Sequence, residues 1–198
     1  MSTAAAPIRT GAVLADLLPA AARYRYAVDT ALVAGGAVLT GVAAQIAVPV
    51  PGSPVPVTGQ TFAALLVGAS LGARRGFLSL AAYALVGMAG MPWFAGGSSG
   101  AGGASFGYVL GMLLAATVVG ALARRGGDRS VLRTAGTMVL GSAITYAVGV
   151  PYLALSTGMS ASAAIAAGLV PFLIGDALKA ALAMGALPAA WKLVGRRG

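Results

Sequence analysis

Two charged side chains stand inside the last apolar stretch of the sequence, in the segment PFLIGDALKAAL. Asp176 and Lys179 are three residues apart, a spacing that places them on one face of a helix, where they can form an ion pair. Each costs about 2.5–3.5 kcal/mol at the centre of a membrane helix on insertion scales, so such a pair marks a functional site by default. The alternatives are a purely structural ion pair and a Lys179 side chain that extends to the membrane edge. Pro171 predicts a bend just before the pair.

Three further polar side chains lie on or beside apolar stretches: Gln45, Gln60 and Tyr146. Each can donate hydrogen bonds to a ligand, and each can equally satisfy a neighbouring helix. For any one of them taken alone, the second role is the better interpretation.

The sequence lacks the groups that most enzymes need. It has no His, no Cys and no Glu, and its four acidic residues are Asp16, Asp29, Asp128 and Asp176. This composition removes most metal sites and the usual general bases. No GxxxxGK[ST] loop is present to hold ATP, so ATP-driven transport would need a separate subunit. We expect neither enzymatic activity nor a cofactor.

These residues must be positioned within a lipid bilayer. The chain has 198 residues, of which 59% are hydrophobic and 9% are charged, and its mean hydropathy is +0.90. Soluble domains carry roughly a quarter charged residues, so this chain could not cover a water-exposed surface. The net charge of +9 does not indicate nucleic-acid binding, because the basic residues form small groups between long apolar runs.

Six apolar stretches are long enough, or nearly so, to cross a bilayer. We place them at about 27–48, 59–73, 76–91, 106–123, 134–156 and 162–190. Twelve of the thirteen basic residues fall in the N-terminal tail, the 2–3 loop, the 4–5 loop and the C-terminal tail, which share one side in a six-span chain. The positive-inside rule therefore predicts cytoplasmic termini. The expected domains are an interfacial N-terminal segment (1–26), a six-helix transmembrane domain (27–191) and a basic tail (192–198).

Two outer connectors and one terminal segment differ in composition from the spans. The 1–2 connector contains four prolines, and the 3–4 connector has six glycines from Gly96 to Gly107. Prolines restrict the backbone, whereas a long glycine-rich connector often serves in binding. The segment GAVLADLLPAA favours a short interfacial helix and a disordered tail about equally.

The sequence resembles the BioY family, the biotin-specific substrate-capture subunits of energy-coupling factor transporters. The matching segments are AQIAVPVPGSPVPVTGQTFAALLVGASLGARRG, YALVGMAGMPWFAGGSSG, FGYVLGM and PFLIGDALKAAL, which appear in the family's order over about 45–180. Near Tyr108 the sequence departs from the usual Gly-Pro-Thr-Gly-Gly-Tyr. The resemblance implies a multi-pass protein of the bacterial cell membrane, with a six-helix bundle that binds biotin near its outer face beneath the two connectors.

The resemblance also implies partners, namely a membrane-embedded coupling subunit and a pair of ATPase subunits, and it leaves a homo-oligomer open. Small residues on the first span, Ala31 and Gly35, would contact the coupling subunit. The alternative is a stand-alone secondary transporter or facilitator that uses Asp176 and Lys179 as an ion relay. No inverted repeat is visible between the two halves.

The chemistry of biotin suits the candidate residues. Asp176 can accept a hydrogen bond from a urea N–H, and Lys179 can donate to a ligand oxygen. Further ligand contacts are expected from Gln60, from Tyr146 and from the connector region: Phe94, the backbone N–H groups of Gly96 and Gly97, and Tyr108.

Overall fold

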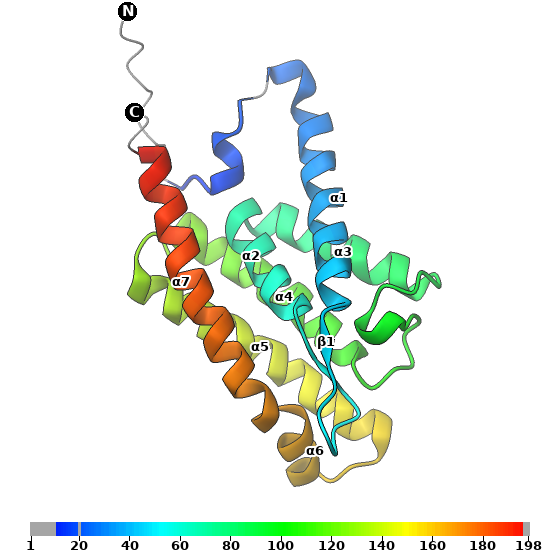
Figure 1. Ribbon diagram of the computed structural model, residues 1–198. Coiled ribbons are helices and arrows are strands. Elements are labelled where there is room, and N and C mark those ends of the chain that lie inside the picture. Colours follow the sequence, from blue (N-terminus) through cyan, green and yellow to red (C-terminus); the bar gives the residue numbers. More distant parts are fainter. Residues whose placement is uncertain (1–10, 20, 196–198) are drawn as a thin grey trace, which may run out of the picture.

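The computed structural model describes residues 11–19 and 21–195 as an all-helical bundle with one small hairpin. Its helices and strands are α1 (Arg25–Ala44), β1 (Ala47–Val48), β2 (Val57–Thr58), α2 (Gln60–Leu71), α3 (Ala73–Met88), α4 (Phe106–Arg124), α5 (Val131–Thr157), α6 (Ala161–Gly168) and α7 (Leu173–Gly195). Short 3₁₀ turns occupy Leu14–Leu17, Ala22–Tyr24, Ala95–Gly97 and Val170–Phe172. The start of α1 and the end of α7 lie at one end of the molecule, and the hairpin and α6 lie at the other (Figure 1).

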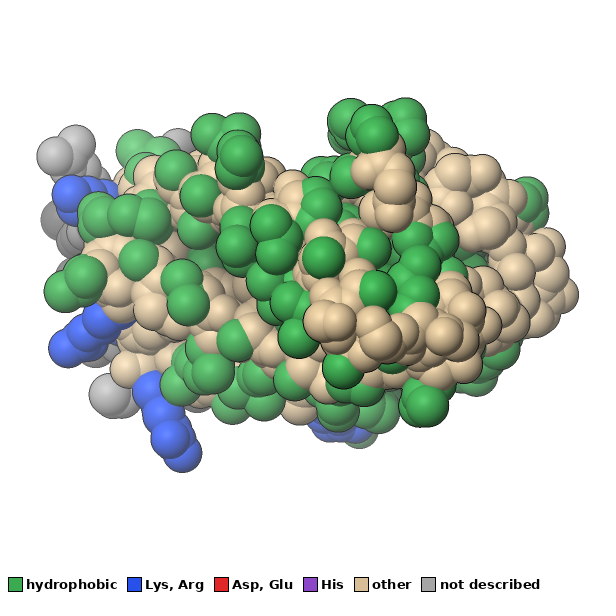
Figure 2. Space-filling view, turned by 90° about the horizontal axis from the view of Figure 1, so that it is seen from below, with side chains coloured by type: hydrophobic (Ala, Val, Ile, Leu, Met, Phe, Trp, Pro, Cys, Tyr) green, Lys and Arg blue, Asp and Glu red, His purple; other side chains and the backbone are tan. Residues whose placement is uncertain are grey.

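Each of the six predicted spans contains a helix, which confirms the six-helix bundle. Within the described residues, four helical segments are long and apolar enough to cross a membrane: Ala22–Ala44, Phe106–Arg124, Val131–Thr157 and Ala161–Val194. α2 and α3 are shorter, with 12 and 16 residues. Viewed from the end that carries the hairpin, the surface consists mainly of hydrophobic side chains and of backbone and uncharged polar side chains, and Lys and Arg appear only at the margin (Figure 2). This distribution fits the charge-poor 1–2, 3–4 and 5–6 connectors.

The sixth predicted span, 162–190, is not one continuous helix. It divides into α6, the 3₁₀ turn at Val170–Phe172 and α7. Pro171 lies in this turn, where its fixed φ and missing N–H interrupt regular helical hydrogen bonding. The bend predicted at Pro171 is therefore confirmed. The transmembrane domain was expected to end at residue 191, but α7 continues to Gly195 and so includes the first residues of the expected basic tail. Residues 196–198 of that tail lie outside the described residues.

Helix α4 is the centre of the bundle and packs on α2, α3 and α5. Glycines allow these close approaches. A Cβ atom at Gly111 of α4 would lie 2.6 Å from the backbone oxygen of Thr145 in α5, and one at Gly68 of α2 would overlap the backbone of Ala116 in α4. Because lipid provides no hydrophobic drive for helix association, such small-residue contacts supply packing energy instead.

Residues 11–19 of the N-terminal segment pack against the bundle. Its 3₁₀ turn at Leu14–Leu17 contacts α2, and Val13 is fully buried. The carboxylate of Asp16 accepts hydrogen bonds from Arg75 at 2.8 Å and from Arg124 at 3.3 Å. Burial would raise the pKa of Asp16, but the hydrogen bonds from Arg75 and the Val13 backbone outweigh this effect and lower it. Of the two alternatives for this segment, a short interfacial helix and a disordered tail, residues 14–17 favour the first: they form one short helical turn, tied to the bundle by charge.

Candidate ligand-binding site

Asp176 and Lys179 lie in the first two turns of α7, directly after the break at Pro171. The break puts the Asp176 carboxylate in the first turn of a helix, where the macrodipole favours negative charge. Lys179 Nζ donates a hydrogen bond to Asp176 Oδ1 at 3.1 Å, so the predicted ion pair is present. The two side chains are mostly buried, with 18% of Lys179 and 14% of Asp176 exposed.

Two other helices complete the polar network around this pair. Lys179 Nζ also donates to Thr61 Oγ1 of α2 at 2.7 Å, and the Tyr146 hydroxyl of α5 donates to Asp176 Oδ2. Tyr146 was among the predicted ligand residues, whereas Thr61 was not. Thr61 adjoins Gln60 in the sequence, but a threonine at a helix start gives no signal of its own, because it commonly satisfies local backbone groups.

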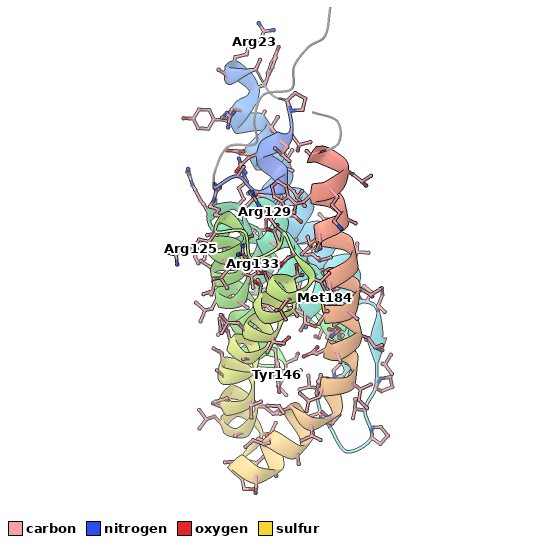
Figure 3. All side chains as sticks on the ribbon, turned by 90° about the vertical axis from the view of Figure 1, so that its left-hand side faces the viewer. Arg23, Arg125, Arg129, Arg133, Tyr146 and Met184 are labelled. Atoms are coloured by element: carbon pink, nitrogen blue, oxygen red, sulfur yellow. The ribbon has the colours of Figure 1, made fainter. Side chains whose placement is uncertain are left out.

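Asp176 of the ion pair lines a groove between α5 and α7 with a volume of about 630 Å³. Figure 3 shows Tyr146 in the space between these two helices. The groove is almost wholly apolar apart from Ser142, Tyr146 and Asp176. A small neighbouring cavity reaches Thr61 and Lys179 and shares Met138, Ser142, Asp176 and Ala180 with the groove. Ser142 is one helical turn before Tyr146, so the i, i+4 spacing could have identified it.

Aromatic rings form the wall behind the groove. The ring centroid of Phe172, in the turn before α7, is 6.5 Å from that of Tyr146 and 6.2 Å from that of Tyr108. The buried Tyr108 hydroxyl donates to the backbone oxygen of Gly168 at 2.7 Å, which fixes the end of α6. Tyr108 therefore supports Tyr146 and Phe172 from behind and does not itself line the groove.

The 1–2 connector covers the start of α7. Its two strands pair antiparallel, with Val48 opposite Val57. Val57 also packs on Gly175 of α7: a Cβ atom added to Gly175 would lie 3.3 Å from Cγ1 of Val57. Val55 is buried in one cluster with Tyr108 and Phe172. The proline-rich hairpin thus folds over the residue immediately before Asp176.

The 3–4 connector is anchored on the other side of the bundle. Phe94 is buried against Tyr83 of α3, with ring centroids 5.2 Å apart, and Gln60 accepts a hydrogen bond from the Tyr83 hydroxyl at 3.0 Å. Gly96 and Gly97 adopt positive φ of 67° and 72° and have no other residue within 4 Å of an added Cβ. The structure does not bring these four predicted ligand residues to the α5–α7 groove.

Ala31 and Gly35, the predicted docking residues, are exposed on α1. They line a second groove, between α1 and α2, of about 360 Å³ that contains no charged side chain. An added Cβ at Gly35 would meet nothing within 4 Å, so the face is open.

Comparisons with known proteins agree with this architecture. The chain is 36% identical over 159 residues to the probable biotin transporter BioY of Pyrococcus horikoshii, which covers 79% of this chain and 91% of that protein. It is 34% identical over 154 residues to the biotin transporter BioY2 of Lactococcus lactis, and this alignment covers 76% of this chain and 83% of that protein. The fold matches the crystal structure of the S-component for biotin from an ECF-type ABC transporter with a TM-score of 0.77, at 21% identity, covering 87% of this chain and 95% of that one. The BioY family matches residues 15–196, and the chain belongs to this family.

Proposed function

We propose that this chain binds biotin in the α5–α7 groove and acts as the substrate-capture subunit of an ECF-type transporter. The observation that carries the proposal is the Asp176–Lys179 pair: Asp176 lines the groove, and Lys179 lines the small cavity that adjoins it. Its relatives in Pyrococcus horikoshii and Lactococcus lactis are named as biotin transporters, which indicates biotin as the ligand. The groove volume of about 630 Å³ falls within the range of roughly 300–1,000 Å³ typical of small-molecule sites.

The hydrogen-bonding capacity left at the pair suits biotin. Each carboxylate oxygen of Asp176 accepts one hydrogen bond within the protein and retains a lone pair for a urea N–H. Lys179 uses two of its three donors on Asp176 and Thr61, which leaves one for a ligand oxygen. The apolar remainder of the groove suits the thioether ring and the aliphatic chain of biotin.

The hairpin between α1 and α2 gives the site a cover. Because Val57 packs on Gly175, a ligand that reaches Asp176 from the outer end must pass the edge of this hairpin. Its four prolines limit the number of conformations that the hairpin can adopt when it moves. We infer that biotin enters by displacement of the hairpin and is enclosed when the hairpin returns.

The remaining predictions on location and partners belong to the same proposal. We place the termini in the cytoplasm by the positive-inside rule and the chain in the bacterial cell membrane. Ala31 and Gly35 form the contact with a membrane-embedded coupling subunit, because an uncharged groove with a small-residue edge accommodates an apolar helix. The ATPase subunits supply the energy for release of biotin inside.

Equilibrium binding of labelled biotin to the detergent-purified chain tests the proposal. We expect unlabelled biotin to compete and riboflavin and thiamine to have no effect. Asp176→Asn and Lys179→Ala should each weaken binding by about tenfold or more, since a charge-assisted hydrogen bond contributes about 1.5–3 kcal/mol. Lys192→Ala, an exposed lysine on the same helix, is the matched control and should bind normally.

Two outcomes would contradict the proposal. Displacement of biotin by the other vitamins would show that the substrate is misidentified. Uptake by vesicles that contain this chain alone, abolished by an uncoupler, would assign the chain to the secondary transporters instead.

A further inference from the structure

A third groove, between α1 and α3, combines a cationic end with an apolar end. It has a volume of about 560 Å³. Its lining residues are Tyr26, Asp29, Thr30 and Val33 of α1, Arg74, Arg75, Leu78, Ala81, Ala82 and Leu85 of α3, and Arg124 at the end of α4. It lies apart from the α5–α7 groove and shares no lining residue with it.

The charges at one end do not cancel. Arg75 contacts Asp16 and Asp29, each at 2.8 Å, and Arg124 contacts Asp16 at 3.3 Å. Arg74 is exposed and has no carboxylate partner within the described part of the chain. Three arginines against two aspartates, Asp16 and Asp29, leave an excess of one positive charge.

The other end presents aliphatic side chains along one face of α3. Arg74, Leu78, Ala81 and Leu85 follow one another at intervals of four, three and four residues, so they lie in one row along that helix. Leu78 and Leu85 are 42% and 61% exposed. Ala81 and Ala82, which lie between these leucines in the sequence, line the groove with small methyl side chains.

We propose that this groove binds one anionic phospholipid, with its phosphodiester at Arg74 and Arg124 and an acyl chain along Leu78, Ala81 and Leu85. A phosphodiester carries one negative charge, which matches the excess positive charge at this end of the groove. Guanidinium groups bind phosphate oxygens through paired hydrogen bonds, and basic pockets between membrane helices bind lipid headgroups. Under the orientation proposed above, this end faces the cytoplasmic leaflet.

The contrast with the groove on the other side of α1 favours a lipid over a protein helix. The α1–α2 groove contains no charged side chain and suits an apolar helix. An apolar helix bound in the α1–α3 groove would lie against Arg74. The guanidinium group would then be desolvated without gaining an oppositely charged partner, which is unfavourable. A phospholipid supplies both the counter-charge and the apolar chain.

Native mass spectrometry of the delipidated chain with added lipid tests this inference. We expect retention of phosphatidylglycerol over phosphatidylcholine with the same acyl chains. Arg74→Gln should reduce phosphatidylglycerol retention by about tenfold, the loss expected for one charge-assisted contact. Arg125→Gln removes the same charge from a side chain that points away from the bundle in Figure 3, and it should retain the lipid as wild type does. A monodisperse gel-filtration peak for each variant confirms folding.

The apolar end and the competing occupants need separate tests. Ala81→Phe narrows the groove and should weaken retention of phosphatidylglycerol. Equal retention of the two lipids, equal loss in R74Q and R125Q, or displacement of the lipid by inorganic phosphate would overturn the inference. Because the chain has no native cysteine, A81C gives one labelling site. Protection of that thiol by a coupling subunit, and not by phosphatidylglycerol, would assign the groove to a protein partner and likewise overturn it.

Discussion

The interaction between Asp176 and Lys179 can be measured by a double-mutant cycle. In Lys179→Met the carboxylate loses its donor at 3.1 Å and Thr61 loses its donor at 2.7 Å, while the hydrogen bond from Tyr146 remains. Breaking a buried ion pair costs about 3–5 kcal/mol, and the residual exposure of both side chains favours the lower figure, about 3 kcal/mol.

The other two variants complete the cycle. In Asp176→Asn the amide oxygen still accepts from Lys179 or Tyr146, so a loss of about 2 kcal/mol follows from removing a charged hydrogen-bond partner. The double variant leaves no unpaired charge and should lose about 3 kcal/mol. The resulting coupling energy is about 2 kcal/mol, within the range for residues in contact.

Reversible unfolding in mixed detergent micelles, followed by the fluorescence of the two tryptophans, gives the free energies. The same variants are then tested for binding of labelled biotin. All three should lose binding by about tenfold or more, and the absence of an unpaired charge in the double variant should not restore it.

A control cycle combines Asp176→Asn with Lys192→Met on the exposed face of the same helix, where the effects should add within about 0.5 kcal/mol. Additive effects in the Asp176–Lys179 cycle would refute the energetic pairing of the two side chains. Normal biotin binding by the double variant would refute their role in the site.

Three other substitutions probe packing, pH dependence and docking. Gly111→Ala should destabilise the chain by about 1–3 kcal/mol, because the added methyl group would overpack against the α5 backbone. Gly136→Ala is the control: its methyl group enters open space, so the change in the free energy of unfolding should lie between zero and a gain of about 1 kcal/mol. Asp128 is fully buried beside Trp191, and desolvation raises its pKa above 3.8, so its contribution to stability should be greatest below about pH 4 and fall as pH rises through the native pKa. The difference in thermal stability between wild type and Asp128→Asn, measured at successive pH values, should change in that direction, and a constant difference would contradict the assignment. Gly35→Leu should reduce co-purification of the coupling subunit while leaving biotin binding unchanged; normal assembly would remove this face from the docking surface.

The helices of this protein could be predicted well because the bilayer leaves few alternatives. Backbone groups in lipid must be satisfied within a helix, so apolar length and the pattern of basic residues suffice to count the spans. The limits of α4, predicted at 106–123, differ from the observed Phe106–Arg124 by one residue. The sixth span was less well predicted, because Pro171 allows either a kink or a complete break, and packing of Phe172 against Tyr108 and Tyr146 selected the break.

The candidate site was only partly predictable for a related reason. Asp176 and Lys179 interact within one helical turn, so their spacing alone specifies the contact. Thr61 and Tyr146 reach the pair from other helices, and the crossing of α2, α5 and α7 decides which side chains meet. Likewise, both outer connectors were expected over the ligand, but Phe94 holds the 3–4 connector on α3, whereas the hairpin reaches α7 where Val57 meets Gly175.

The amino-acid sequence by itself determined that this chain is a membrane protein, that it has six apolar spans, and that its last helix carries a charged pair. Those properties depend on composition and on contacts within one turn of helix. The tertiary structure alone decided that Asp176 of the pair lines a groove and that Thr61 and Tyr146 complete the hydrogen bonds of the pair. Those contacts join residues 30 and 118 positions apart, and their geometry is set by how closely the glycine-lined helices pack.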